Sequence, residues 1–289
     1  MLASRNTNGT EHIVGTGYLG TVKQDTEVNL TGGEIYGSVY GGGNMAAYKP
    51  VSNTDLAEVI IDGCDLTSIE YVYGGGNAAS VPAAQVTVNG THEIGTVFGG
   101  GNGKDALPNG DPNPGAHVGY KADGTTAYGT GNANVYLFGG TIHNAFGASN
   151  TLGSIRGKSE QHVNEAKDGS GNAVCPLILD ELYGGGNEAY MEGGTNIDLG
   201  CITSLKTIYG GAKNADVNGD INLTITSGHF DRVFGGNNLG GTISGTITVN
   251  IEETGCNPIT IGELYGCGNQ AKVIGNTNVV VGKDSTANP

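Results

Sequence analysis

The 289-residue sequence contains no tryptophan, no long apolar run and no sustained helical pattern. A membrane-spanning helix needs about 20 consecutive apolar residues, so we expect no helical membrane span. Crossover helices of an α/β protein would place apolar residues at a 3.6-residue period over long segments. Because no such segment occurs, the sequence favours an all-β fold.

Basic residues are also scarce. Thirteen Lys and Arg stand against 28 Asp and Glu, which gives a formal net charge of -15. This charge repels phosphate backbones and anionic lipids, so nucleic acid is not an expected partner. A polysaccharide lyase would be expected to combine clustered acidic calcium ligands with a basic residue, and the three arginines (Arg5, Arg156 and Arg232) match this poorly. The sequence predicts no catalytic residue set.

Metal-ligand patterns are missing as well. The six histidines share no repeat position and the five cysteines form no C-x-x-C pair, so no metal site or cofactor is predicted. Calcium alone stays open as a ligand. Residues 109–114, with Asp105 and Asp123 nearby, offer the carboxylate and carbonyl oxygens that this ion prefers. The competing interpretation is an ordinary proline-rich loop.

Glycine is abundant, with 54 residues, and much of it lies in a repeated phrase. An aliphatic residue precedes Tyr or Phe, and a glycine-rich run ending in Asn follows. The aromatic residues are Tyr40, Tyr73, Phe98, Phe146, Tyr183, Tyr209, Phe234 and Tyr265. The asparagines are Asn44, Asn77, Asn102, Asn150, Asn187, Asn214, Asn238 and Asn269. An apolar residue also stands four positions before the aromatic in the later copies, and Tyr36 takes that place in the first.

Alternating segments such as residues 86–89 and 247–250 precede the repeated phrase and predict half-buried strands. If each repeat forms one turn of a coil, equivalent strands pair in parallel ~4.8 Å apart and satisfy each other's backbone groups. The prediction is a right-handed parallel β-helix, or β-solenoid, of about eight coils. Residues 1–25 are expected to form an N-terminal cap or leader region. Residues 26–289 form the solenoid, with insertions at about 103–131 and 153–174.

Stacked coils place each repeated residue above its counterpart. The asparagines should therefore form a structural ladder of amides along the axis. The aromatic column either fills the interior or stands outside as a platform for sugars, and phenylalanine at three places favours burial. The glycines indicate either corners with positive φ or a backbone approach too close for a Cβ atom.

One further column carries titratable side chains. Three positions before the aromatic stand His143, Asp180, Lys206 and Asp231, flanked by Glu181 and Arg232. This candidate ligand face suits a carbohydrate, a cation or an acid/base pair. The competing interpretation is a solvated strip of alternating charges. We also expect Cys175 and Cys201 to be near neighbours on adjacent coils, as a disulfide or as two buried thiols.

The repeat resembles the right-handed parallel β-helix superfamily, which includes pectin-degrading enzymes, phage tailspikes and many bacterial surface adhesins. Its YGGGN phrases are most similar to those of large gut-bacterial cell-surface proteins, and the resemblance covers about residues 26–281. It implies an extracellular location at a bacterial surface. Handedness follows from this resemblance and from the rule for parallel crossovers.

These observations predict a non-enzymatic repeat domain that acts as an adhesin or structural stalk. Its expected partners are a carbohydrate or a host or cell-surface protein. Residues 279–281 are followed by no polar cap, so adjoining domains or end-to-end self-association are also expected. The alternative function is a carbohydrate-binding or polysaccharide-cleaving β-helix that uses the face around His143, Asp180 and Asp231.

Overall fold

The computed structural model describes residues 3–5, 11–14, 26–46, 54–104, 106–107, 109–121, 123–254 and 256–282. Within these residues the backbone forms strands, turns and loops but no helix. The described part therefore has no helix with the length and apolar character that a membrane crossing requires. The prediction of an all-β fold is confirmed.

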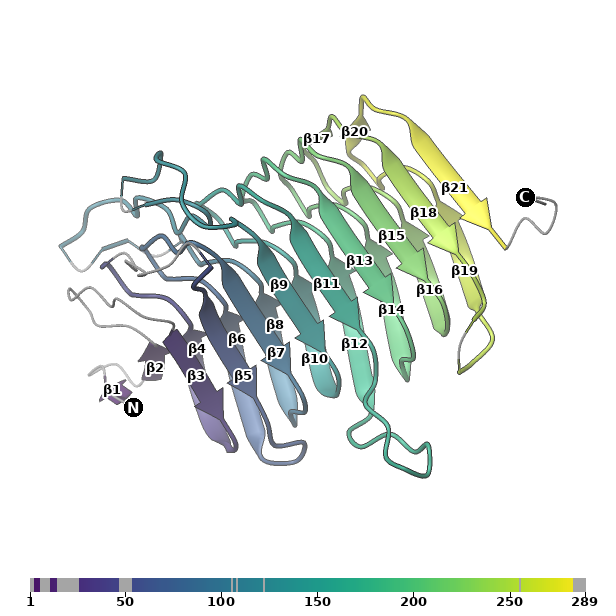
Figure 1. The fold of residues 1–289 in the computed structure, drawn as a ribbon, viewed down its shortest axis with the longest axis horizontal. Coiled ribbons are helices and arrows are strands. Elements are labelled where there is room, and N and C mark those ends of the chain that lie inside the picture. Colours follow the sequence, from purple (N-terminus) through teal and green to yellow (C-terminus); the bar gives the residue numbers. More distant parts are fainter. Residues whose placement is uncertain are drawn as a thin grey trace.

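Most strands belong to two long sheets, A and B, each of which follows the stack of coils from one end to the other (Figure 1). Sheet A has the order β1 (Ala3–Arg5), β2 (Glu11–Val14), β4 (Gly33–Tyr40), β6 (Thr67–Tyr73), β8 (Glu93–Phe98), β10 (Gly140–Phe146), β12 (Leu177–Tyr183), β14 (Ser204–Tyr209), β16 (His229–Phe234) and β19 (Thr260–Tyr265). Sheet B contains β3 (Thr26–Leu30), β5 (Ala57–Ile61), β7 (Ala84–Val88), β9 (Ala133–Leu137), β11 (Ser159–Val163), β13 (Thr195–Leu199), β15 (Ile221–Ile225), β18 (Ile247–Ile251) and β21 (Thr277–Val281). Apart from the antiparallel pair β1–β2, the strands of both sheets pair in parallel, as the predicted β-helix requires.

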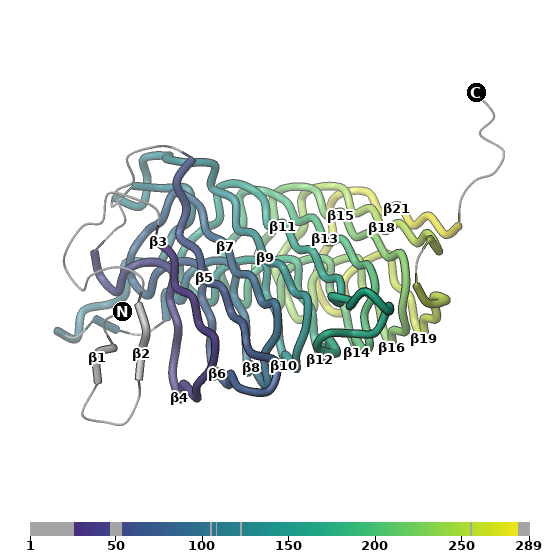
Figure 2. Tube along the Cα trace, turned by 60° about the horizontal axis from the view of Figure 1, so that its bottom comes forward, coloured from purple at the N-terminus to yellow at the C-terminus, as the bar shows by residue number. Residues whose placement is uncertain are grey.

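A third, narrower side completes each coil. Parallel bridges connect Val81, Val118, Ile155, Met191, Val217 and Ile243 from coil to coil, and all six side chains are fully buried. Ile243 lies in β17 (Thr242–Ile243), which pairs with β20 (Lys272–Val273) near the C-terminal end. The chain thus winds around a three-sided apolar core, and Figure 2 shows the coils stacked along one axis.

The two long sheets differ in how their side chains alternate. In sheet B, alternate side chains enter the core, as in β5, where Val59 and Ile61 are buried and Glu58 and Ile60 are not. In sheet A, two successive side chains point outward before the aromatic corner. Asp180 and Glu181 of β12, for example, lie between buried Leu179 and buried Leu182. This bend gives the outer face of sheet A a double row of side chains.

The first copy departs from the predicted register. The pairing of β4 with β6 shifts between Ile35 and Ser38, which indicates a β-bulge. Ile35 is therefore the residue that pairs with Ile69 in the core row. The prediction that Tyr36 takes this place is wrong, because the bulge leaves Tyr36 69% exposed.

Close backbone contact between coils explains the glycine after each aromatic residue. A Cβ atom on Gly74 would lie 2.5 Å from the carbonyl oxygen of Gly99, and one on Gly184 would lie 2.0 Å from that of Gly210. Neither Gly74 nor Gly184 has a positive φ. Steric exclusion of a side chain, rather than a left-handed backbone, therefore requires glycine at these positions.

The two predicted insertions are partly regular structure. Within residues 103–131, Val118 keeps its place on the third side, and the flanking segments form the loops. Within residues 153–174, β11 pairs with both β9 and β13, so the insertion as predicted begins too early and the irregular segment is 164–176. Polar Ser159 and Gln161 occupy interior places in β11, which hides the strand pattern. In the predicted cap, β2 extends sheet A beside β4, and residues 1–2, 6–10 and 15–25 lie outside the described residues.

Two disulfides join Cys64 to Cys175 and Cys201 to Cys256. The predicted proximity of Cys175 to Cys201 on adjacent coils does not lead to a bond. The Cys64–Cys175 bond instead spans the two coils whose short turns lie at residues 89–92 and 138–139, and the Cys201–Cys256 bond spans the coil whose short turn lies at 226–228. Gly90 lies against Cys175 and Cys64, and Ser227 Oγ lies 3.0 Å from Cys256 Sγ. Cys267 is exposed and forms no disulfide.

Replacing Gly184 by Ala tests the glycine corner. The added methyl would overlap the Gly210 carbonyl oxygen, 2.0 Å away, so the coils must separate. We expect Gly184→Ala to lower the free energy of unfolding by about 1–3 kcal/mol, the usual cost of overpacking. Gly169→Ala is the matched control, because a Cβ on this exposed loop glycine would meet no atom within 4 Å. Equal stability of both variants in denaturant titrations would contradict this account.

Candidate functional site

The aromatic column is buried beside the main core. Seven of its rings, from Tyr40 to Phe234, are at most 4% exposed, and neighbouring ring centroids lie 4.6–5.0 Å apart. The predicted burial is confirmed for these seven, but they form a cluster of their own, separate from the main apolar core. Tyr265 continues the stack 4.8 Å from Phe234 but is 46% exposed, because it belongs to the last coil.

The asparagine ladder runs beside the rings and is directional. The Nδ2 amide of Asn77 donates to Oδ1 of Asn44 at 2.9 Å, and the same bond recurs from Asn102 to Asn77, from Asn150 to Asn102 and from Asn187 to Asn150. Asn269 likewise donates to Asn238. The amides therefore hold successive coils in register, which is the structural role predicted from the sequence.

Asn214 is not part of this ladder. The backbone N–H of Lys213 donates to Gly186 and that of Asn214 to Asn187, which places Lys213 at the ladder position and Asn214 one residue beyond it. The number of residues after the aromatic, not the residue type, sets this position. Asn238 instead donates to the Tyr183 hydroxyl at 3.0 Å, and that hydroxyl donates to Glu181 at 2.8 Å. Burial, followed by the Glu181 hydrogen bond, raises the pKa of Tyr183.

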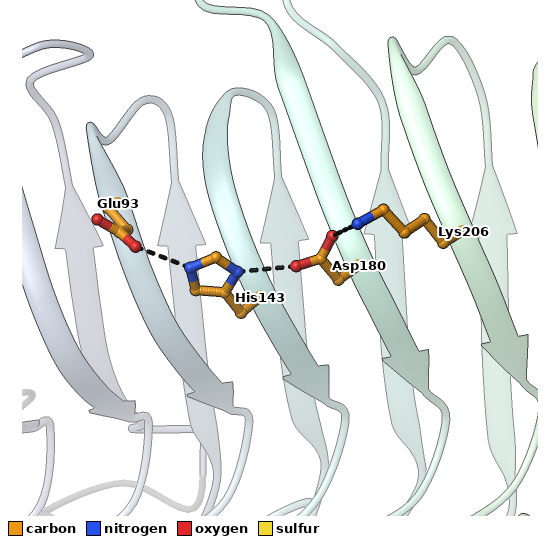
Figure 3. Close-up of polar contacts among 4 residues, drawn as sticks. All are labelled: Glu93, His143, Asp180 and Lys206. Atoms are coloured by element: carbon orange, nitrogen blue, oxygen red, sulfur yellow. Dashed lines mark hydrogen bonds and ion pairs between the residues drawn. The ribbon is translucent and has the colours of Figure 1, made fainter.

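The candidate ligand face lies on the outer side of sheet A, with its side chains in one row (Figure 3). His143 Nδ1 lies 2.8 Å from Asp180 Oδ2, and its Nε2 lies 2.8 Å from Glu93 Oε1. Lys206 Nζ contacts the other Asp180 oxygen, Oδ1, at 2.6 Å. Asp231 continues the row and lies 3.7 Å from the imidazole of His229. The repeat register predicts the proximity of these four residues but not that of Glu93, which stands two positions earlier in its own strand.

Proton affinities follow from these contacts. Hydrogen bonds with Asp180 and then Glu93 raise the pKa of His143. Burial alone would raise the pKa of Asp180, but hydrogen bonds from His143 and Lys206 outweigh it and lower that pKa. The hydrogen bond with Asp180 raises the pKa of Lys206. Asp180 is thus held as a carboxylate with both oxygens engaged.

A notch opens beside this row, with a volume of about 380 Å³. Thr207 lies in register between Glu181 and Arg232, so a short side chain separates two long ones. Thr207 is 3% exposed and forms the floor of the notch. Asn144 also lines the notch. Thr207 carries no signal in the sequence, because the notch forms only when the longer side chains of the neighbouring coils stand on either side of it.

The loop considered for calcium uses its polar groups internally. Asn109 donates to Asp111, and Asp123 accepts hydrogen bonds from the Thr126 hydroxyl and the backbone of residues 125 and 126. These bonds, led by that of the Thr126 hydroxyl, lower the pKa of Asp123 to about 2. Asp105 lies outside the described residues. Among the residues described, no group of three or more His, Cys, Asp or Glu side chains is placed to hold a metal ion.

Comparison with known proteins identifies no relative of this chain. No protein-family model matches it, and neither a curated protein nor a solved structure does. Functional inference therefore depends on the residues and their geometry.

The His143 contacts predict a measurable protonation behaviour. In NMR titration, we expect the pKa of His143 to lie above its ordinary value of 6.5 and to fall in Asp180→Asn, because the amide cannot stabilise the imidazolium in the same way. Asp198→Asn, on sheet B, is the control and should leave His143 unchanged. An unaltered His143 pKa in Asp180→Asn would contradict the proposed contact.

The same contact links stability to pH. Folding raises the pKa of His143, so protonation of this residue stabilises the folded state. This contribution to the free energy of unfolding is complete at a pH below the pKa of His143 in the unfolded chain. It is lost as the pH rises through the pKa of His143 in the folded protein. Both side chains are partly exposed, and such pairs contribute less than about 1 kcal/mol, so the NMR titration is the more sensitive measurement.

Proposed function

We propose that this chain is a non-enzymatic, extracellular repeat domain that acts as a rigid stalk or adhesin at a bacterial cell surface. The observation that carries the proposal is a continuous axial stack of coils braced by two long-range disulfides. The bacterial origin and the surface location rest on the resemblance of the YGGGN repeats. The rod shape supports a spacing role.

The disulfides support the extracellular part of this proposal. Disulfides persist in oxidising compartments and are rare in reducing ones. The linked cysteines are 111 and 55 residues apart in the sequence. In the chain-entropy model, closing a loop of this size lowers the entropy of the unfolded chain and so stabilises the folded state by about 4–5 kcal/mol for each disulfide. A domain that works outside the cell gains durability from such links.

The charged row supports binding over cleavage. A general acid or base must exchange a proton near the working pH. Asp180 has a lowered pKa, and its two oxygens already contact His143 and Lys206. These contacts favour a fixed recognition surface.

Pulling on the two ends of the chain tests the stalk. The oxidised protein should unfold at a higher force than the reduced protein, because the disulfides keep the enclosed segments from extending. An extended chain spans about 3.5 Å per residue. The fully stretched oxidised chain should therefore be shorter than the reduced chain by roughly 390 Å for the segment enclosed by Cys64–Cys175 and roughly 190 Å for the one enclosed by Cys201–Cys256. A Cys64→Ser/Cys175→Ser variant is the control and should recover only the longer increment. Equal forces and lengths in both redox states would overturn the stalk proposal.

Alkylation of thiols before lysis of the native cells tests the location. We expect Cys64, Cys175, Cys201 and Cys256 to be protected and Cys267 to be labelled. Peptide mapping then identifies the two linkages. Labelling of all five cysteines would assign the chain to a reducing compartment and overturn the extracellular proposal.

A further inference from the structure

The notch on sheet A has a buried floor between two charged side chains. Its floor, Thr207, is nearly fully buried, and the walls, Glu181 and Arg232, are aligned with it by parallel strand pairing. The volume of about 380 Å³ lies at the lower end of the range for small-ligand sites. The recess therefore has room for a small polar group but not for a protein chain element.

Three polar side chains line this recess beside the charged row. Thr207, Arg232 and Asn144 supply a hydroxyl, a guanidinium and an amide, and within the described residues the buried atoms without a hydrogen-bond partner lie elsewhere, on Ser159 and Gln161. A ligand that bonds to these three side chains displaces water from them. Glu181 adds a carboxylate, of which one oxygen accepts from Tyr183. Donors and acceptors thus face the same small volume.

Charge around the recess disfavours a strongly ionic ligand. Asp180, Glu181 and Asp231 are opposed by Lys206 and Arg232, and His143 becomes cationic as the pH falls. An acidic sugar would meet three carboxylates. A basic ligand would meet two cations, and Asp180, the most enclosed carboxylate of the row, is already paired with His143 and Lys206. Hydroxyl groups, which both donate and accept, match this mixture without a desolvated charge.

We propose that the notch formed by Asn144, Glu181, Thr207 and Arg232 binds a neutral, hydroxyl-rich saccharide unit. This inference rests on the proposed adhesin function and names its ligand class. Arg232 donates to one sugar hydroxyl, Glu181 accepts from another, and Thr207 contacts the group that reaches the floor. The His143–Asp180–Lys206 row fixes the rim before binding, which reduces the conformational entropy lost on association.

Native gel electrophoresis of the full chain tests the inference, with glucan, mannan, galactan or xylan cast in the gel. Alginate and chitosan serve as the acidic and basic probes. We expect at least one neutral polysaccharide to retard the protein, and Thr207→Val to weaken that retardation about tenfold, because a ligand hydroxyl loses its partner. Arg232→Gln should weaken it similarly. Thr224→Val, on the outer face of sheet B, is the matched control and should bind like the wild type.

The inference is overturned if no neutral polysaccharide retards the wild type, if only alginate or chitosan does, or if Thr207→Val and Arg232→Gln bind normally. Thermal melting checks the fold of each variant. If Thr207→Val is unstable, Arg232→Gln decides, because this side chain is exposed and unpaired within the described chain. Failure here leaves the disulfide-braced stalk intact, whereas reduced cysteines with normal saccharide binding would overturn only the extracellular location.

Discussion

Backbone contact at the glycine corners is the constraint on which the other features depend. A Cβ at Gly184 or Gly210 would lie within about 2 Å of the next coil's carbonyl oxygen, so these residues set how closely the coils approach. At that spacing the rings stack at 4.6–5.0 Å and the Asn amides reach each other at 2.9–3.0 Å. A wider corner would lose the stacking and the amide bonds together.

Repetition in the sequence was sufficient to predict the architecture, because equivalent residues of a solenoid must lie above one another. The aromatic column and the row from His143 to Asp231 follow from that rule alone. Prediction failed where a coil departs from the average. Ser159 and Gln161 put polar side chains in the interior and concealed β11, and the bulge after Ile35 moved Tyr36 outward. The cysteine pairing depends on turn lengths, which the repeated phrase does not specify.

The outer face of sheet A depends on an irregularity within the regular fold. Two successive outward residues in strands such as β10 and β12 create a double row, which strict alternation would not allow. One row, through Asp180, is consumed by contacts between coils, and the other contributes Thr207 and Arg232 to the notch. The same bend therefore separates groups that contact the neighbouring coils from groups that line the notch.

The direction of the asparagine ladder gives the rod an electrostatic polarity. Each amide donates toward the N-terminal coil, so the side-chain dipoles from Asn44 to Asn187 are aligned, with their partial negative ends toward the C-terminus. Lys213 occupies the ladder position immediately beyond Asn187. A cation at the negative end of aligned amides is the arrangement that stabilises helix C-termini. The break in the ladder thus ends one dipole array at a basic residue, and the two ends of this array are electrostatically distinct.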